Sequence, residues 1–272
     1  MGWPVKSNPM YDIAFIFAGF FVGIVVGLTG VGGGSLMTPI LIFVFGVKPY
    51  MAVGTDLLFA AFTKMGGTVK MARSGLVPWR VVLHLSAGSI PAALVTLWVL
   101  KNVGPADAAI QHLMTSTLGV ALLLTAAATL YKAVRGKAAP LRIAAGQEAV
   151  ATTPRHWCLP LLLGALIGIL VSLTSVGAGA IGVTALMLLY PLLPLPRIVA
   201  ADIAYAVPLT LVAGAGHASL GSVDWSMLGL LLAGSLPGIW LGSHFMTRVP
   251  ERAIRSLLSV LLAYAGTKLI AL

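Results

Sequence analysis

Gly27-Leu-Thr-Gly-Val-Gly-Gly-Gly-Ser35 interrupts a long apolar stretch of the chain, and apolar residues resume directly after it. Five of the eight residues from Gly27 to Gly34 are glycine, which is costly inside a helix because it loses much conformational freedom on folding. We therefore expect two helical arms joined by an unwound tip. A related stretch, Ser172-Leu-Thr-Ser-Val-Gly-Ala-Gly-Ala180, follows 145 positions later, and 23–35 and 168–180 share eight of thirteen residues. The sequence thus predicts the same glycine-tipped hairpin twice.

The composition is typical of a polytopic membrane protein. Of 272 residues, 59% are hydrophobic and 9% are charged, whereas soluble domains are about 25% charged. The net charge of +10 comes from basic residues in short loops, so it does not indicate a nucleic-acid partner. The single cysteine, Cys158, excludes an intramolecular disulfide, and its apolar flanks predict a packing residue. No convincing cleavage site follows the first apolar segment, which is expected to remain in the mature protein.

The apolar residues fall into ten segments, five before and five after one long basic stretch. They lie at about 13–28, 35–46, 51–70, 81–100 and 110–131, and then at 157–174, 180–195, 198–217, 226–246 and 253–271. Crossing the hydrocarbon core of roughly 30 Å takes about 20 helical residues. Because the segment 35–46 would be only about 18 Å long, we expect this hairpin arm to stop part-way through the bilayer.

The basic stretch divides the chain into a first repeat (1–131), a linker (132–156) and a second repeat (157–272). Outside the glycine stretches the repeats align at an offset of 146, with twelve identical residues among the 47 from Tyr50 to Thr96. The shared positions include Asp56 and Asp202, and also a glycine, a tryptophan and an Ala-Gly-Ser motif followed by proline. This pattern indicates an internal duplication.

The basic residues also predict the orientation. If every segment reverses the chain direction, twelve Lys and Arg residues lie on one side of the membrane and four on the other. By the positive-inside rule, the linker 132–156 is cytoplasmic and both termini lie outside the cytoplasm. Each half then crosses an odd number of times, so the second repeat is inverted relative to the first, an arrangement typical of transporters.

The two glycine tips are candidates for an anion site. A helix that restarts at an unwound tip presents unpaired N–H groups and the positive end of its dipole, which favour an oxyanion. The alternative is that the glycines only allow helices to pack closely. The site interpretation names the following candidates: Thr29, Gly30, Gly32, Gly33, Gly34, Ser35 and Thr38 in the first copy, and Thr174, Ser175, Gly177 and Gly179 in the second.

These residues resemble the TauE/SafE sulfite exporter family over essentially the whole chain. The resemblance rests on the first glycine stretch with the following Pro39, on the second copy, and on the Gly-Thr-Asp motif that ends at Asp56. The second copy is weaker, because Ala178 and Ala180 replace a glycine and a serine, and Asp56 stands where the family often has serine. The resemblance implies a transporter of sulfite, sulfonates or other small sulfur-containing anions in the bacterial inner membrane.

Three charged residues within the apolar segments have two interpretations each. Lys64 either binds an entering anion or extends its ammonium group to the membrane surface. Asp56 and Asp202 are expected in equivalent first turns of their helices, where a carboxylate complements the helix N-terminus, and the alternative role is proton coupling. His84, His112 and His217 lack ligand spacing, so we expect no metal site.

Together these observations predict an all-α polytopic membrane protein that transports a small inorganic or organic sulfur oxyanion by alternating access. The alternatives are a channel-like anion conductor and a membrane accessory subunit that transports nothing itself. An enzyme is not expected, because no pair of nucleophile and base is evident, and neither is a cofactor. The sequence does not indicate the oligomeric state or the coupling ion.

Overall fold

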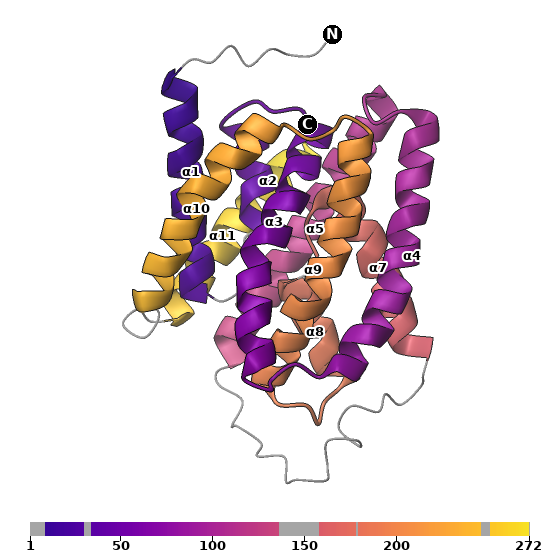
Figure 1. Cartoon of the computed structure of the whole chain (residues 1–272), viewed down its shortest axis with the longest axis vertical. Coiled ribbons are helices and arrows are strands. Elements are labelled where there is room, and N and C mark those ends of the chain that lie inside the picture. The colour runs from indigo at the N-terminus through magenta and orange to yellow at the C-terminus, as the bar shows by residue number, and fades with distance from the viewer. Residues whose placement is uncertain (1–8, 30–33, 136–157, 178, 246–250, 272) are drawn as a thin grey trace.

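The computed structural model describes residues 9–29, 34–135, 158–177, 179–245 and 251–271, and within these ranges the chain forms helices and no strands. Ten helices stand in one bundle (Figure 1). They are α1 (Pro9–Thr29), α2 (Gly34–Phe43), α3 (Pro49–Arg73), α4 (Trp79–Val103), α5 (Ala108–Arg135), α7 (Cys158–Thr174), α8 (Ala180–Leu189), α9 (Leu195–Ser219), α10 (Trp225–Phe245) and α11 (Glu251–Ile270). They match the ten predicted segments, which confirms the all-helical fold class.

Two of the connections between helices have the same backbone geometry. Gly75, after α3, and Gly221, after α9, have φ angles of 66° and 69°, in the left-handed region that favours glycine. Their N–H groups donate to the carbonyls of Ala72 and Ala218 at 3.1 and 3.0 Å. Each glycine thus ends one long helix, and the next helix begins at a tryptophan four residues later.

Within the described ranges, five helices are long and apolar enough to cross a membrane: Tyr11–Leu28 within α1, α4, Ala108–Tyr131 within α5, α9, and Trp225–His244 within α10. Helix α3 is equally long, with 25 residues, but it carries several charged side chains, including Asp56 and Lys64. Helices α2 and α8 have only 10 residues each, which corresponds to about 15 Å. The predicted shortness of the arm 35–46 is confirmed by α2.

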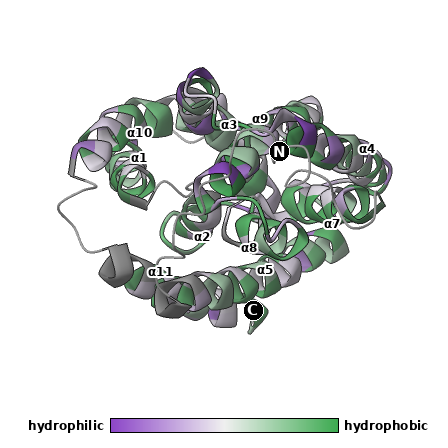
Figure 2. Ribbon diagram, turned by 90° about the horizontal axis from the view of Figure 1, so that it is seen from below, coloured by the Kyte–Doolittle hydropathy of each residue, from purple (hydrophilic) through white to green (hydrophobic). Residues whose placement is uncertain are grey.

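The helices pair across the two halves of the sequence. Helix α1 packs on α10, α4 on α7, α3 on α9, and α5 on α11. Figure 2 shows the short helices α2 and α8 in the middle of the bundle, between the row that contains α3 and α9 and the row that contains α5 and α11. The bundle therefore surrounds the two arms that follow the glycine stretches.

Helices α1 and α10 approach so closely that their backbones touch. A Cβ atom on Gly19 or Gly23 of α1 would collide with the α10 backbone at Leu231 or Ser235. Glycines of α10, among them Gly238, face the α1 backbone in the same way. Small residues that permit such contacts are common where membrane helices associate. In this helix pair, the glycines therefore allow close packing. Close packing is also the alternative role that the sequence left open for the glycines of the two tips.

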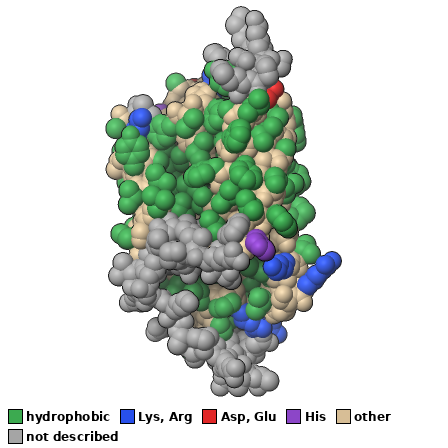
Figure 3. Space-filling view, turned by 90° about the vertical axis from the view of Figure 1, so that its left-hand side faces the viewer, with side chains coloured by type: hydrophobic (Ala, Val, Ile, Leu, Met, Phe, Trp, Pro, Cys, Tyr) green, Lys and Arg blue, Asp and Glu red, His purple; other side chains and the backbone are tan. Residues whose placement is uncertain are grey.

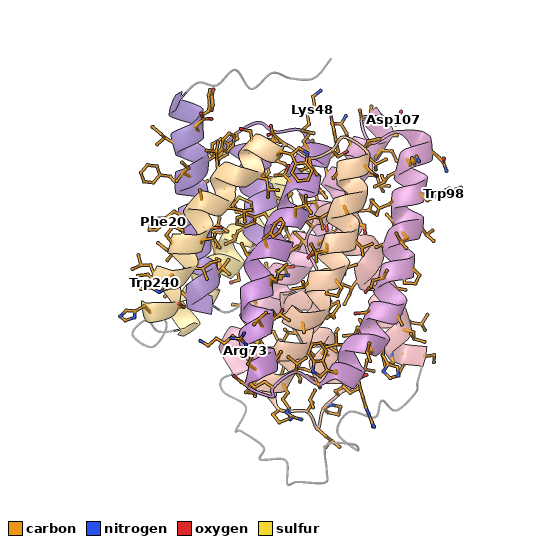
Figure 4. The ribbon with its side chains drawn as sticks, viewed as in Figure 1. Phe20, Lys48, Arg73, Trp98, Asp107 and Trp240 are labelled. Carbon is orange, nitrogen blue, oxygen red and sulfur yellow. The ribbon has the colours of Figure 1, made fainter. Side chains whose placement is uncertain are left out.

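Hydrophobic side chains cover the middle of the molecule, and charged side chains gather toward its ends (Figure 3). Lys48 and Asp107 lie at one end of the bundle and Arg73 at the other (Figure 4). At the same end as Arg73, the Arg197 side chain donates to the Gly75 carbonyl at 3.4 Å. Cys158, which we predicted to be a packing residue, is exposed, so that prediction is wrong.

Candidate functional site

Asp56 lies at the centre of a contact between three segments that are far apart in the sequence. Its side chain, in the second turn of α3, is 0% exposed. The Thr38 hydroxyl of α2 donates to Asp56 Oδ2 at 2.5 Å. Ser175, which follows α7, lies beside the same carboxylate. The structure thus brings together two predicted anion-site residues and one of the two predicted proton-coupling residues.

Helices α7 and α8 lie on either side of the second glycine stretch, and the described residues between them are not helical. Helix α7 ends at Thr174 and α8 begins at Ala180, and between them Ser175, Gly177 and Gly179 have φ angles of 59°, 136° and 140°. The Thr174 hydroxyl is engaged within this turn: it lies 2.6 Å from the Leu170 carbonyl oxygen and accepts from the N–H of Val176 at 3.1 Å. Of the two hydroxyls at this tip, that of Ser175 therefore faces the carboxylate.

Helices α3 and α9 run antiparallel, and two contacts fix their register. The Thr68 hydroxyl donates to the Ile203 carbonyl at 3.4 Å, and Gly54 lies against the His217 side chain. Consequently, a residue of α3 and a residue of α9 lie at the same level along the bundle when their residue numbers add up to about 271. This relation allows charged residues on the two helices to be compared along one axis.

Lys64 lies near the level midway between the two aspartates. Eight residues separate it from Asp56, a rise of about 12 Å along α3. Asp202 of α9 is level with Val69 of α3, about 8 Å beyond Lys64 in the opposite direction. The Lys64 ammonium group interacts electrostatically with Asp202 first and with Asp56 second, in the order that these distances imply.

The Lys64 side chain is only 6% exposed, so the interpretation in which it extends to the membrane surface is wrong. The helix-capping interpretation of the two aspartates is wrong as well. Helices α3 and α9 begin at Pro49 and Leu195, which leaves Asp56 and Asp202 seven residues inside them, beyond the first turn. Proline at the N-terminus of each helix starts it earlier than hydrophobicity indicated.

Asp202 lies in a crowded contact between α9 and α8. A Cβ atom on Gly182 of α8 would collide with the Asp202 carboxyl group and would come within 3.1 Å of the Tyr205 hydroxyl oxygen. Both Asp202 and Tyr205 are buried. Helix α8 therefore contacts Asp202, the buried acid of the same half of the chain, at Gly182, which has no side chain.

The first glycine tip falls largely outside the described residues, which include neither Gly30, Gly32 nor Gly33. Of its other candidates, Thr29 ends α1, Gly34 begins α2, and Ser35 is partly buried in the first turn of α2. Their role in anion binding stays a prediction. For metals, the described ranges contain no group of three or more His, Cys, Asp or Glu side chains that could hold an ion.

The model of the sulfite exporter TauE/SafE family matches residues 15–269 of this chain. The chain belongs to the TauE/SafE sulfite exporter family. A probable membrane transporter protein, YjnA of Bacillus subtilis, is 33% identical to it over 95% of this chain and 100% of the relative. YdhB of the same organism, also named a probable membrane transporter protein, is 26% identical over 92% of this chain and 97% of the relative. No solved structure matches the chain.

Membership of the TauE/SafE family confirms the resemblance that the sequence indicated. Several apolar helices and the family together identify a multi-pass membrane protein from a family of transporters. That the relatives are named transporters is consistent with the expectation that the chain is not an enzyme.

Sequence reasoning missed two residues near the site of this TauE/SafE protein. Gly182 was not singled out, because the equivalent residue of the first repeat is Met37 and the two repeats share no glycine at this position. His217 was considered only as a metal ligand. In the structure it is buried in α9, and its Nε2 lies 2.9 Å from the Ser172 carbonyl oxygen in the last turn of α7. With Nε2 protonated, it satisfies a carbonyl that the break after α7 leaves without a helical partner.

Proposed function

We propose that this TauE/SafE protein is a secondary transporter of small sulfur-containing anions, sulfite or an organosulfonate, and that it works by alternating access. The observation that carries the proposal is the position of Lys64. A buried basic residue in a membrane-spanning bundle is costly unless it serves a charged ligand or partner. Lys64 lies near the level midway between two buried acids, which is where an alternating-access transporter holds its ligand.

The proposal includes two inverted repeats. Helices that are equivalent at the offset of 146, α3 with α9 and α5 with α11, pair with each other, and α1 with α10 corresponds to α7 with α4. The antiparallel register of α3 and α9 supports an inverted relation between the halves. So do the matching turns at Gly75 and Gly221, which Figure 1 places at opposite ends of the bundle, between α3 and α4 and between α9 and α10.

We place the anion near the two glycine tips. Helices α2 and α8 begin in the middle of the bundle, after the tips, so their positive dipole ends and N–H groups are directed into protein instead of lipid. Lys64 supplies the opposite charge for the anion. The irregular backbone at Ser175, Gly177 and Gly179 supports this assignment, because irregular backbone inside a membrane protein is tolerated where it lines a cavity or is enclosed by protein.

Orientation and coupling belong to the same proposal. The linker 132–156 is placed in the cytoplasm of a bacterial cell, with both termini outside the inner membrane, as the twelve-to-four distribution of basic residues predicts. Asp56 and Asp202 are the acids available for proton coupling, because both are buried within helices that cross the bundle.

Reconstitution tests the function directly. Purified protein in liposomes should take up sulfite or taurine in a saturable way, and the preferred anion should raise the unfolding temperature in a screen that includes sulfate, thiosulfate and sulfoacetate. Uptake that rises linearly with concentration would indicate a channel. Absence of flux for all five anions, together with a partner that stays bound during purification, would indicate an accessory subunit.

A further inference from the structure

The buried charges of α3 and α9 do not balance. Among the described residues, the buried side chains that are ordinarily charged are Asp56, Asp202 and Lys64, two acids and one base. Lys64 lies closer along the helix axis to Asp202 than to Asp56, and Asp202 is its strongest electrostatic partner. Lys64 therefore compensates the charge of the Asp202 carboxylate. Asp56, in contrast, lies about 12 Å from Lys64 along the axis of α3.

Among the described residues, the side chains that touch the Asp56 carboxyl group are neutral hydroxyls, and Lys64 acts on it only electrostatically along α3. Asp56 Oδ2 accepts from the neutral hydroxyl of Thr38. Ser175, which is 5% exposed, interacts with this carboxylate, and neither Asp56 Oδ1 nor the Ser175 hydroxyl has a well-oriented hydrogen-bond partner among the described residues. Since Ser175 directly follows α7, the negative end of that helix dipole also lies beside the carboxylate. A bare carboxylate is strongly disfavoured at such a place unless a positive group neutralises it.

We infer that Asp56, Ser175 and the C-terminal end of α7 bind a monovalent cation, a proton or a sodium ion, which neutralises the carboxylate. The C-terminal ends of broken helices and unwound backbone bind Na⁺ or H⁺ in transporters with this kind of architecture. The Oδ1 atom and the Ser175 hydroxyl face the ligand, and Thr38 holds the other carboxylate oxygen in place.

The groups around Asp56 come from several elements. Helix α2 contributes Thr38, and the tip after α7 contributes Ser175, both neutral. Helix α3 itself contributes Lys64, whose positive charge also acts on Asp56. Helix α9, which packs along α3, carries Asp202, Tyr205 and His217, and of these only His217 lies near the level of Asp56.

The second repeat lacks the same set of groups. The counterpart of Thr38 is Val183, which has no hydroxyl, and the counterpart of Ser175 is a glycine. Asp202 instead faces Gly182 and interacts with Lys64. The cation site is thus specific to the first acid, and it distinguishes the two aspartates that the duplication makes equivalent in sequence.

If the chain transports an anion as proposed above, a cation at Asp56 that moves with the anion would reduce the net charge carried across the membrane, whereas a cation exchanged against the anion would increase it. This consequence rests on the proposed function. The existence of the site does not, because cation binding can be measured without any anion or flux.

The test uses the purified full-length protein at constant ionic strength and measures thermal unfolding in sodium chloride and in choline chloride. Infrared difference spectroscopy on the same samples detects a protonated carboxyl group. For a sodium site we expect a sodium-dependent rise in unfolding temperature that is lost in Asp56→Asn. For a proton site we expect no difference between the salts and a carboxylic-acid band that disappears in Asp56→Asn. Asp107→Asn, at one end of the bundle and away from Asp56, is the control and should keep either signal.

Thr38→Val and Ser175→Gly provide the second line of the test, because each copies the residue at the equivalent position of the other repeat. Each should weaken sodium affinity by about tenfold, or shift the carboxylic-acid band, without abolishing folding. The inference is overturned if the wild type shows neither sodium dependence nor a band that these variants alter. It is equally overturned if Asp202→Asn removes the signal while Asp56→Asn retains it.

Discussion

Gly182 of α8 lies directly against the carboxyl group of Asp202 on α9, so the second broken helix and the central helix of its repeat meet at a position that has room for no side chain. The neighbouring Tyr205 hydroxyl closes the same space. Any movement of α8 relative to α9 therefore changes the surroundings of a buried acid. This contact gives the first prediction.

Gly182→Ala should displace Asp202 or push α8 away from α9, because the added methyl group has no room. We expect a loss of about 1–3 kcal/mol of stability, the usual cost of overpacking, together with reduced transport. Gly229→Ala is the matched control, since a Cβ atom at Gly229 meets nothing within 4 Å. Thermal unfolding and liposome uptake of both variants provide the measurement. Equal behaviour of the two variants would show that the contact does not matter.

Thr38→Val should lower the free energy of unfolding by about 1.5–3 kcal/mol, because it removes a buried hydrogen bond to a carboxyl group while keeping the side-chain shape. Thr38→Ser retains the hydroxyl and should lose much less. Chemical denaturation in detergent compares the two variants with the wild type. A Thr38→Val protein as stable as the wild type would mean that Asp56 finds another donor.

Much of this arrangement could be predicted from the sequence, because it depends on local patterns. Hydrophobicity located the ten helices of the described residues, and the second glycine stretch marked the break between Thr174 and Ala180. The helix starts were less accurate where proline acts. Pro49, for example, begins α3 two residues before the apolar segment, so that Asp56 lies beyond the first turn and is not a capping residue.

The contacts of the site could not be predicted in the same way. Asp56 and Ser175 are 119 positions apart, and their meeting depends on how a broken helix of one half packs on a central helix of the other. Gly182 had no signal, because a single glycine in an apolar helix is unremarkable in a membrane protein. Lys64 was singled out, but its partner depends on the register between α3 and α9, which no sequence pattern in one chain specifies.

Cysteine labelling tests the orientation. After Cys158 is replaced by serine, Ser74→Cys should be labelled only from the cytoplasmic side and Asp107→Cys only from the outside. The two positions lie in connections at opposite ends of the bundle, since Ser74 follows Arg73 and the two ends are marked by Arg73 and Asp107 in Figure 4. Intact cells treated with a membrane-impermeant reagent provide the measurement. Labelling of Ser74→Cys in intact cells would reverse the predicted topology.

The last prediction distinguishes the role of Lys64 as the charge partner of Asp202 from its role in binding the transported anion. Lys64→Gln removes the buried cation that interacts electrostatically with Asp202, and leaving a buried charge uncompensated typically costs about 3–5 kcal/mol. Removing the second charge as well, in Lys64→Gln with Asp202→Asn, should restore most of this stability, whereas Lys64→Gln with Asp56→Asn should restore little.

If Lys64 also binds the transported anion, the stable double variant should still fail to transport, because its fold is repaired but its cation is missing. Lys64→Arg keeps a positive charge and should retain part of the activity. Unfolding curves for the single and double variants give the coupling energy between the two positions, and uptake assays on the same preparations give the activity. Full transport by the stable double variant would assign Lys64 a purely structural role.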